Sequence, residues 1–496
     1  MHHNSNNMKI SSLCLLAAAG TLAEDPRDFT NDLLIPGFHF VPFPFDWMND
    51  PNGPLYDPVH DKYHLFYQYQ TPRMWGHAVS DDLISWTQLP MALTRQNWYD
   101  IGGDFSGSGT VLDDEDQSVV LTVSSSDNSE IFLAVPEDRS DPNLTNWTLP
   151  DYNPIFLTSA RDPTEIMKTP QGNYRIADGT ASGTEMWEVT SFEDIFKNDT
   201  WTKISTFQDN SETGGSYWEC PDVFPLPGAE GDALWVSKYS SSGDHYFLGT
   251  YDESTPEATF VPSDEFSGGA SLMYDQNPSF YASKTFLDSK VEGAERRVLW
   301  GWDRMDPALL PEGGWSQALS LPRELKGIHF AGKTGAGFYL SNYPIAELES
   351  LRNEDSHISS IEHSTLIQDD EPLKLDGVEG RMLDLKFDAD YMNSPENGCG
   401  VRVLWTEGSD EYLDILIPTE LAIPPHNVGS DANFRVLVDS SIVEVFINFG
   451  ERSQTYFSYP KQSSSTSVGI IGKGCVFHSF DSWQMEPMGF DASLVM

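Results

Sequence analysis

Basic residues are few in this sequence. Lysine and arginine together number 29 against 76 aspartates and glutamates, so the 496-residue chain carries a formal net charge of −47 at pH 7. A surface of that sign repels the phosphates of nucleic acids and of anionic membranes. We therefore expect neither a nucleic-acid partner nor a membrane partner.

Long apolar runs are also missing after the N-terminus. There, Lys9 precedes an apolar run at 10–19, and a small-residue site follows and ends at Ala23. A run of about ten residues is too short to span a bilayer, which takes about 20, but it is typical of a secretory signal peptide. We predict a signal peptide over residues 1–23.

Cysteine is scarce, with four residues in the whole chain. Cleavage of the signal peptide would remove Cys14 and leave an odd number, which permits at most one internal disulfide. Cys399 and Cys475 are the expected pair because both lie in the C-terminal third, and Cys220 is expected to be a small buried residue. Acceptor sequons for glycosylation, which suit a secreted chain, stand at Asn143, Asn146 and Asn198. We expect a secreted, extracellular protein, with the vacuole as the alternative.

Helical periodicity is scarce as well. Instead, 12% of the residues are aromatic, and 38 glycines and 32 prolines punctuate short runs rich in β-branched and aromatic residues. Such runs between turn residues predict an all-β protein. In the first part of the chain we expect strands at 63–69, 119–123, 131–135, 234–237, 246–250 and 297–302.

The one candidate helix, 344–352, has apolar residues three apart and lies between a glycine-rich stretch and a polar segment. It predicts a connector between two units: residues 30–335, a linker with a short helix at 336–360, and residues 361–496. In the second unit we expect strands at 382–387, 401–405, 434–438 and 442–447, the last two joined by a tight turn.

Three segments carry a carboxylate within two residues of a proline. They are W-M-N-D-P-N-G at 47–53, R-D-P at 161–163 and W-E-C-P-D at 218–222. A residue before proline is held extended, and proline cannot donate to a strand ladder, so these segments can hold carboxylates at strand edges. Taken singly, each fits an ordinary turn better, because Asp-Pro dipeptides are common turn signals.

The spacing of these motifs is nearly regular. Asp50, Phe105, Asp162, Glu219 and Tyr281 follow one another at intervals of 55, 57, 57 and 62 residues. This favours five structural repeats of the β-propeller kind, with loops longer than in the common propeller repeats of about 40 to 50 residues.

The three carboxylate motifs, in this order and with F-S-G-S at 105–108, resemble the signature of glycoside hydrolase family 32, which comprises invertases, fructan hydrolases and fructosyltransferases. The resemblance runs from about residue 38 to the end. Further motifs that carry it stand at 280–286, 299–302, 321–325 and 438–446. It implies a five-bladed β-propeller followed by a C-terminal β-sandwich.

The resemblance implies a retaining β-fructofuranosidase that hydrolyses terminal non-reducing β-D-fructofuranosides such as sucrose and short fructans. Asp50 would be the nucleophile, Glu219 the acid/base, and Asp162 the residue that holds fructose hydroxyls; the two reacting carboxyls of such enzymes lie about 5 to 5.5 Å apart. Asp50 must be ionised and Glu219 protonated in the free enzyme, which with ordinary carboxyl pKa values indicates an optimum at about pH 4 to 6.

The resemblance also assigns residues to the substrate pocket. Hydrogen bonds to the furanose are expected from Asn49, Gln68, Ser106 and Arg161. Apolar walls are expected from Trp47, Trp75, Phe105, Tyr281 and Trp302. A tryptophan in a β protein is often a core residue, and for Trp302 both roles stay open. Arg161 is expected to pair with a carboxylate, and which one is left open.

No cofactor and no metal are expected. Residues 327–334 fit the Walker A pattern, but the glycines that follow would break the helix that a phosphate loop needs. His60 and His64 have the spacing of metal ligands, but no third ligand is evident.

Two other functions fit the same residues. A fructosyltransferase would use the same intermediate with a sugar as acceptor, although Trp47 favours hydrolysis. A non-catalytic sugar-binding protein would not need all three carboxylates. Residues 303–306 read Asp-Arg-Met-Asp, where plant invertases typically carry Ala-Asn-Glu-Ser-Asp, so sucrose preference over short fructans is open, as is the oligomeric state.

Overall fold

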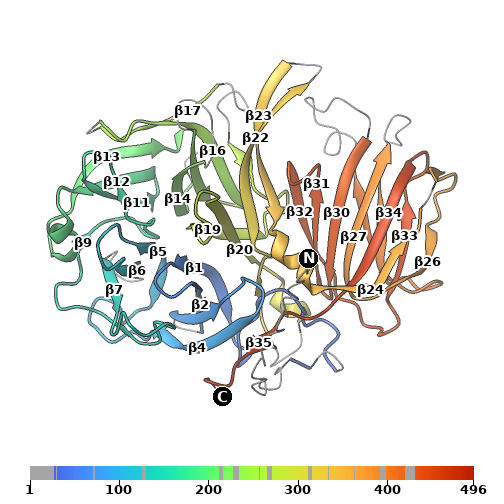
Figure 1. The fold of residues 1–496 in the computed structure, drawn as a ribbon, viewed down its shortest axis with the longest axis horizontal. Coiled ribbons are helices and arrows are strands. Elements are labelled where there is room, and N and C mark those ends of the chain that lie inside the picture. Colours follow the sequence, from blue (N-terminus) through green and yellow to red (C-terminus); the bar gives the residue numbers. More distant parts are fainter. Residues whose placement is uncertain are drawn as a thin grey trace, which may run out of the picture.

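The computed structural model describes residues 27–28, 31–70, 73–125, 130–211, 216–226, 234–255, 257–264, 271–310, 315–332, 335–361, 363–390, 398–418 and 431–495 (Figure 1). The predicted signal peptide, 1–23, lies outside these residues. Strands dominate, and the helical elements of the described part are three short 3₁₀ helices: η1 (Phe192–Phe196), η4 (Pro307–Leu309) and η5 (Ala346–Leu351). Within the same ranges no helix has the length and apolar character needed to span a membrane.

Five antiparallel sheets follow one another along the first part of the chain. The first contains β1 (Met48–Asp57), β2 (Lys62–Tyr69), β3 (Met74–Ser80) and β4 (Trp86–Leu93). The second contains β5 (Asp104–Val111), β6 (Val119–Ser125), β7 (Glu130–Pro136), β8 (Trp147–Thr148) and β9 (Phe156–Leu157). The third contains β10 (Met167–Lys168), β11 (Tyr174–Thr180), β12 (Gly183–Val189) and β13 (Thr202–Asp209).

The fourth sheet contains β14 (Glu219–Pro225), β15 (Trp235–Ser240), β16 (Asp244–Tyr251), β17 (Phe260–Pro262) and β18 (Leu272–Met273). The fifth contains β19 (Phe280–Asp288), β20 (Arg296–Asp303), β21 (Ala318–Leu319), β22 (Arg323–Gly332) and β23 (Gly335–Pro344). One strand from each sheet takes part in the contacts between sheets: β1 packs against β5 and β19, β11 against β14, and β14 against β19. The six strands predicted for this part are confirmed, because each overlaps a strand of these sheets.

Two further sheets form the second part of the molecule, drawn in orange and red in Figure 1. One contains β24 (Arg352–Ser359), β25 (Thr365–Leu366), β27 (Met382–Asp390), β30 (Asp431–Asp439), β31 (Ile442–Ile447), β32 (Arg452–Phe457) and β34 (Val476–Met485). The other contains β26 (Leu373–Glu379), β28 (Cys399–Trp405), β29 (Leu413–Ile417) and β33 (Ser467–Ile471). Buried apolar residues from both sheets, among them Phe387 and Val401, share one core, so the sheets pack face to face as a β-sandwich.

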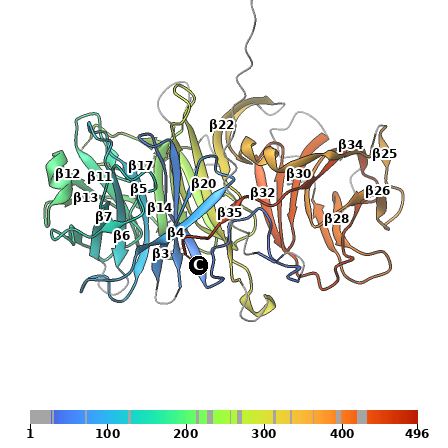
Figure 2. The same cartoon turned by 60° about the horizontal axis from the view of Figure 1, so that its bottom comes forward.

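The predicted boundaries need two corrections. β22 and β23 form a hairpin of the fifth sheet, with Gly332 opposite Gly335, so the expected linker at 336–360 contains nearly all of β23, the last strand of the first part, together with the whole of η5 and β24. The predicted helix at 344–352 is the six-residue η5. At the other end, β35 (Phe490–Asp491) leaves the second part and pairs with β4 of the first sheet, as Figure 2 shows.

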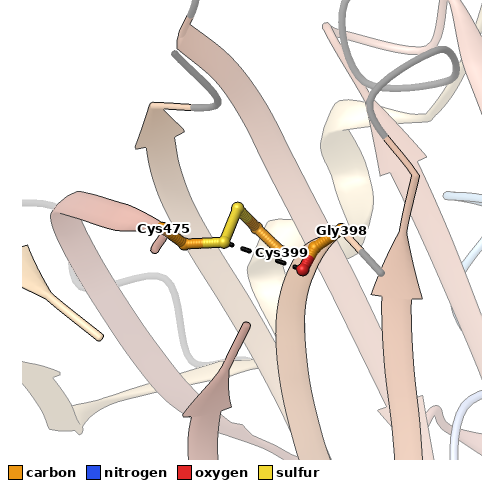
Figure 3. Close-up of a disulfide and its surroundings, with 3 residues drawn as sticks. All are labelled: Gly398, Cys399 and Cys475. Atoms are coloured by element: carbon orange, nitrogen blue, oxygen red, sulfur yellow. Dashed lines mark hydrogen bonds between the residues drawn. A yellow bond between two sulfur atoms is a disulfide. The ribbon is translucent and has the colours of Figure 1, made fainter. Parts of the chain in front are cut away.

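A disulfide joins Cys399, at the start of β28, to Cys475, in the turn before β34 (Figure 3). This confirms the predicted pair. Cys220 is a free, buried cysteine, also as predicted.

A fully buried ionic network connects the two parts of the molecule. Asp439, at the end of β30, accepts hydrogen bonds from the backbone N–H groups of residues 37–39 and from Nδ1 of His39 at 2.7 Å. Glu444 of β31 accepts from the backbone N–H of Leu321, and its carboxylate lies 3.0 Å from the guanidinium of Arg323 in β22. Buried charges that are paired in this way are costly to separate.

This network leads to a stability prediction. Burial lowers the pKa of His39, but its contacts with Asp439 and Glu444 outweigh burial and raise that pKa to about 10. A histidine whose pKa is higher in the folded than in the unfolded state stabilises the fold. This contribution is complete below the unfolded pKa of about 6.5 and is lost as the pH rises through the folded pKa of about 10. We expect Asp439→Asn to lower the free energy of unfolding by about 3 kcal/mol at pH 6, and by less at pH 10.

Urea unfolding at both pH values checks this prediction. Asp376→Asn, at an exposed position of β26, is the matched control and should change the unfolding midpoint little. An Asp439→Asn midpoint equal to that of the wild type at pH 6 would contradict the role of the network.

Candidate active site

A pocket of about 420 Å³ is lined by residues of β1, β2, β5, β14, β19 and β20 and of the segments beside these strands. Segments far apart in the sequence supply its lining. Its residues are Trp47, Asn49, Asp50, Gln68, Arg73, Phe105, Ser106, Arg161, Asp162, Glu219, Tyr281, Trp302 and Arg304. The structure thus brings together the three predicted carboxylates and all the predicted pocket residues except Trp75.

Irregular backbone aims these side chains. The pairing of β1 with β2 breaks register between Met48 and Pro51, around Asp50, and the pairing of β5 with β6 breaks between Asp104 and Gly107. β14 and β19 have the same irregularity directly after their predicted site residues, Glu219 and Tyr281. A bulge at the start of a strand turns a side chain out of the regular alternation.

Positive backbone φ angles mark the same places. Asp162 has φ 62°, Cys220 has φ 46° and Ala282 has φ 53°. Residues other than glycine seldom adopt this conformation, and such strain concentrates at functional sites because the surrounding structure must hold it. These three residues are themselves site residues or the neighbours of site residues in the chain.

Asp50 lies in a chain of short hydrogen bonds. Ser106 Oγ donates to its Oδ2 at 2.5 Å, and Asn49 Nδ2 lies 3.1 Å from Oδ1. Gln68 connects these two neighbours, since it accepts from Asn49 at 2.6 Å and donates to Ser106 at 2.8 Å. The orientation of the Asp50 carboxylate is therefore fixed from both sides.

The charge of Asp50 depends on its surroundings. Burial raises its pKa to about 6, and the negative charges of Asp162 and Glu219 act in the same direction. The hydrogen bond from Ser106 and the positive charge of Arg73 act in the opposite direction. Asp50 is thus ionised above about pH 6 and becomes neutral below it.

Asp162 and Glu219 have different environments. The side chain of Asp162 is only 5% exposed, and its Oδ2 accepts from the backbone N–H of Cys220 at 3.0 Å. Burial raises its pKa, and Arg161 opposes this effect. Glu219 is 31% exposed. A buried, fixed carboxylate suits substrate binding, whereas the more open one can exchange a proton with a bound molecule or water.

Arg161 pairs with Glu219, which answers the question that the sequence left open. Its guanidinium contacts Glu219 Oε1 and lies over the ring of Tyr217 at 4.2 Å. It also approaches Asp162, with Nε 3.6 Å from Oδ2. On the other side of Glu219, Tyr281 Oη donates to Oε2 at 2.5 Å.

One predicted wall residue is wrong. Trp75 is 0% exposed and belongs to the core of the first two sheets, so it cannot contact a ligand. Its Nε1 donates to the backbone carbonyl of Phe105 at 3.0 Å, which places it behind the wall. Trp47, Phe105, Tyr281 and Trp302 do line the pocket. Trp75 is the second residue of β3, just as the pocket residue Asn49 is the second residue of β1, so position at the start of a strand does not separate the two roles.

The sequence interpretation missed two residues of the lining, Arg73 and Arg304. Both guanidinium groups stack on pocket aromatics, Arg73 on Phe105 at 4.9 Å and Arg304 on Tyr281 at 4.7 Å. Arg304 belongs to the segment 303–306 that departs from the plant pattern, which is the one signal that could have indicated it.

Possible ion ligands lie elsewhere. Two groups of His, Asp and Glu residues in the described part could hold a metal: one is His39, Asp303 and Glu444, and the other is Asp390, Asp431 and His478. None of these residues lines the pocket. His64 is not among them, and its Nδ1 lies 3.0 Å from a ring nitrogen of His77.

The comparisons with known proteins agree with this geometry. Residues 39–334 match the model of the glycosyl hydrolases family 32 N-terminal domain, and residues 347–484 match that of the family 32 C-terminal domain. Together these matches span most of the chain. The pocket thus belongs to a glycoside hydrolase, and the chain is a member of glycosyl hydrolase family 32.

Curated relatives include an acid beta-fructofuranosidase of Phaseolus vulgaris, 30% identical over 90% of this chain and 80% of that protein. Another, from Vicia faba, is 36% identical over 64% of this chain and 51% of that protein. Among solved structures, fructan 1-exohydrolase IIa of Cichorium intybus in complex with 1-kestose aligns with a TM-score of 0.76 and 24% identity, over 93% of this chain and 99% of that one. This last likeness shows a shared fold.

Proposed function

We propose that the protein is a retaining β-fructofuranosidase that hydrolyses terminal non-reducing β-D-fructofuranosides. The observation that carries the proposal is the convergence of Asp50, Asp162 and Glu219 in one pocket of a family 32 chain whose relatives are acid beta-fructofuranosidases. We further infer that the five sheets of the first part are the blades of a five-bladed β-propeller, with the pocket at its axis.

The contacts support a two-step mechanism. Asp50, held by Ser106 and Asn49, attacks C2 of the fructosyl unit while Glu219 gives a proton to the leaving oxygen. A fructosyl ester on Asp50 results. Glu219 then takes a proton from water, which attacks C2 and frees the Asp50 carboxylate with overall retention.

Neighbouring groups assist both steps. Asp162, a buried carboxylate of the pocket, accepts from fructose hydroxyls, and Arg161 and Tyr281 hold the two oxygens of Glu219. Asn49 and Gln68 line the same pocket and offer amide groups to the furanose, with Trp47, Phe105 and Trp302 as its apolar walls.

Product analysis with sucrose separates the candidate functions. A hydrolase releases glucose and fructose in equal amounts. A fructosyltransferase releases an excess of glucose over fructose and forms longer oligosaccharides. A sugar-binding protein without activity gives a binding signal and neither product, and this outcome would overturn the proposal.

The substrate range is proposed from the same relatives. Sucrose and short fructo-oligosaccharides are the expected substrates, since one structural neighbour was solved with 1-kestose and another, from Bombyx mori, with sucrose. Hydrolysis rates on sucrose, kestose, inulin and levan would rank them. Vacuolar enzymes among the relatives are compatible with either a secreted or a vacuolar protein.

A pH prediction follows from the contacts of Asp50. Because the nucleophile must be ionised, kcat/KM should fall below about pH 6, which is higher than ordinary carboxyl pKa values indicated. Ser106→Ala removes a hydrogen bond that lowers the pKa of Asp50. We expect the acidic limb to move upward by about one pH unit.

Profiles of kcat/KM from pH 4 to 9 test this prediction. Ser108→Ala is the matched control, because Ser108 lies on the same strand but donates to the carbonyl of Pro163 instead. An unchanged acidic limb in Ser106→Ala would mean that another group controls it. A wild-type profile still rising at pH 8 would contradict the role of Glu219 as proton donor.

A further inference from the structure

Arg304 lies beside Tyr281, the residue that contacts the proposed acid/base Glu219. Its guanidinium lies 4.7 Å from the ring centre of Tyr281, and the Tyr281 hydroxyl donates to Glu219 Oε2 at 2.5 Å. Glu219 is the proposed donor to the leaving oxygen. The chain of contacts therefore runs from Glu219 through Tyr281 to Arg304.

The guanidinium of Arg304 is held but not neutralised. It stacks on Tyr281 and, at 5.8 Å, on Trp302, and it donates to the carbonyl of Pro278 at 3.1 Å. Arg161, another arginine of the pocket, is paired with Glu219. Among the described residues, no carboxylate oxygen lies within the 4.0 Å of an ion pair for Arg304. An arginine fixed in its plane by stacking keeps N–H groups available for a ligand.

We propose that Arg304 binds the leaving-group sugar, and so selects fructosides whose aglycone is a second sugar ring. The inference rests on the proposed function. Guanidinium N–H groups donate to ring hydroxyls, and the rings of Trp302 and Trp47, packed edge to face with centres 6.2 Å apart, offer apolar surface to the sugar. The residue is exposed and lines the pocket, as this contact requires.

Arg73 provides an internal comparison. It also lines the pocket and stacks on an aromatic ring, that of Phe105. Its charge acts on the nucleophile, because it lowers the pKa of Asp50. Every fructoside needs the same nucleophile, so replacement of Arg73 should lower kcat/KM for all fructosides alike. Replacement of Arg304 should lower kcat/KM only for fructosides whose leaving group is a second sugar.

The experiment compares kcat/KM for sucrose and 1-kestose with that for methyl β-D-fructofuranoside, whose leaving group is methanol. We expect Arg304→Ala to lower kcat/KM for the two oligosaccharides about tenfold relative to the methyl fructoside, mainly through KM. In Arg73→Gln the ratio should stay within about twofold of the wild type. Arg402→Ala is the control outside the pocket, since Arg402 stacks on Tyr412 of the sandwich at 3.6 Å.

The outcomes are distinct. Equal losses on all three substrates in Arg304→Ala, or no loss on any, would overturn the inference, as would the same selective loss in Arg73→Gln. If the wild type hydrolyses none of the three substrates, the proposed function itself fails. Circular dichroism and thermal melting of each variant confirm that the compared proteins are folded.

Discussion

Asp50→Ala should abolish turnover, with kcat at least about 10⁴-fold below the wild type. Alanine has no oxygen to bond C2, so no fructosyl ester forms. The remaining pocket still holds Asp162 and Glu219, and binding of sugar should persist. Initial rates with sucrose, and binding of sucrose measured by calorimetry on the same variant, separate the loss of chemistry from the loss of affinity.

The matched control is Asp138→Ala. Asp138 is an exposed aspartate of a turn, bonded to Ser140, and its removal should leave kcat unchanged within about twofold. Activity of Asp50→Ala close to that of the wild type would remove Asp50 from the mechanism, and with it the covalent intermediate.

The strands were largely predictable from local sequence, and the reason is physical. Runs such as 119–123 contain valine and leucine between turn residues, and β6 is buried along its whole length because both of its faces are covered. The hairpin of β22 and β23 was missed because glycines at its tip suggest a loop. Its pairing depends on partners in the sheet, and local propensity does not report them.

The site was predictable where a motif fixes both the residue and the backbone. All three carboxylates stand beside prolines, and Asp50 and Glu219 also stand at register breaks, whereas Asp162 has a positive φ. Trp75 was misplaced because only tertiary packing separates a wall residue from the one behind it. Arg304 was missed for the same reason, since its position on Tyr281 depends on the return of the chain after β20.

In the second part of the chain, too, some features could be predicted from the sequence, whereas contacts between distant residues could not. The Cys399–Cys475 disulfide could be inferred by counting cysteines. The connection of Asp439 to His39 could not, because 400 residues separate the two. This network lies outside the pocket, so Asp439→Asn should keep kcat within a few-fold of the wild type even though it destabilises the fold.

Glu219→Ala should lower kcat for sucrose by about 10³-fold, with a smaller loss for a fructoside that has an activated aryl leaving group. An aryl oxide departs without a proton, so Asp50 can still form the ester. The second step then becomes slow, because no base activates water. Arg161 and Tyr281 would lose their shared partner, and the space left by the carboxylate is open to small anions.

Azide tests this scheme directly. In Glu219→Ala it should attack C2 of the ester, displace the Asp50 carboxylate and give β-fructosyl azide, with a rate of aryl release that rises with azide concentration. Glu137→Ala, an exposed position, should show no azide effect. Product of the opposite anomeric configuration would indicate direct displacement without an ester. The retained anomer requires two displacements at C2, one by Asp50 and one by azide from the side where the Glu219 carboxylate is missing. Its formation would therefore place Asp50 and Glu219 on opposite sides of C2.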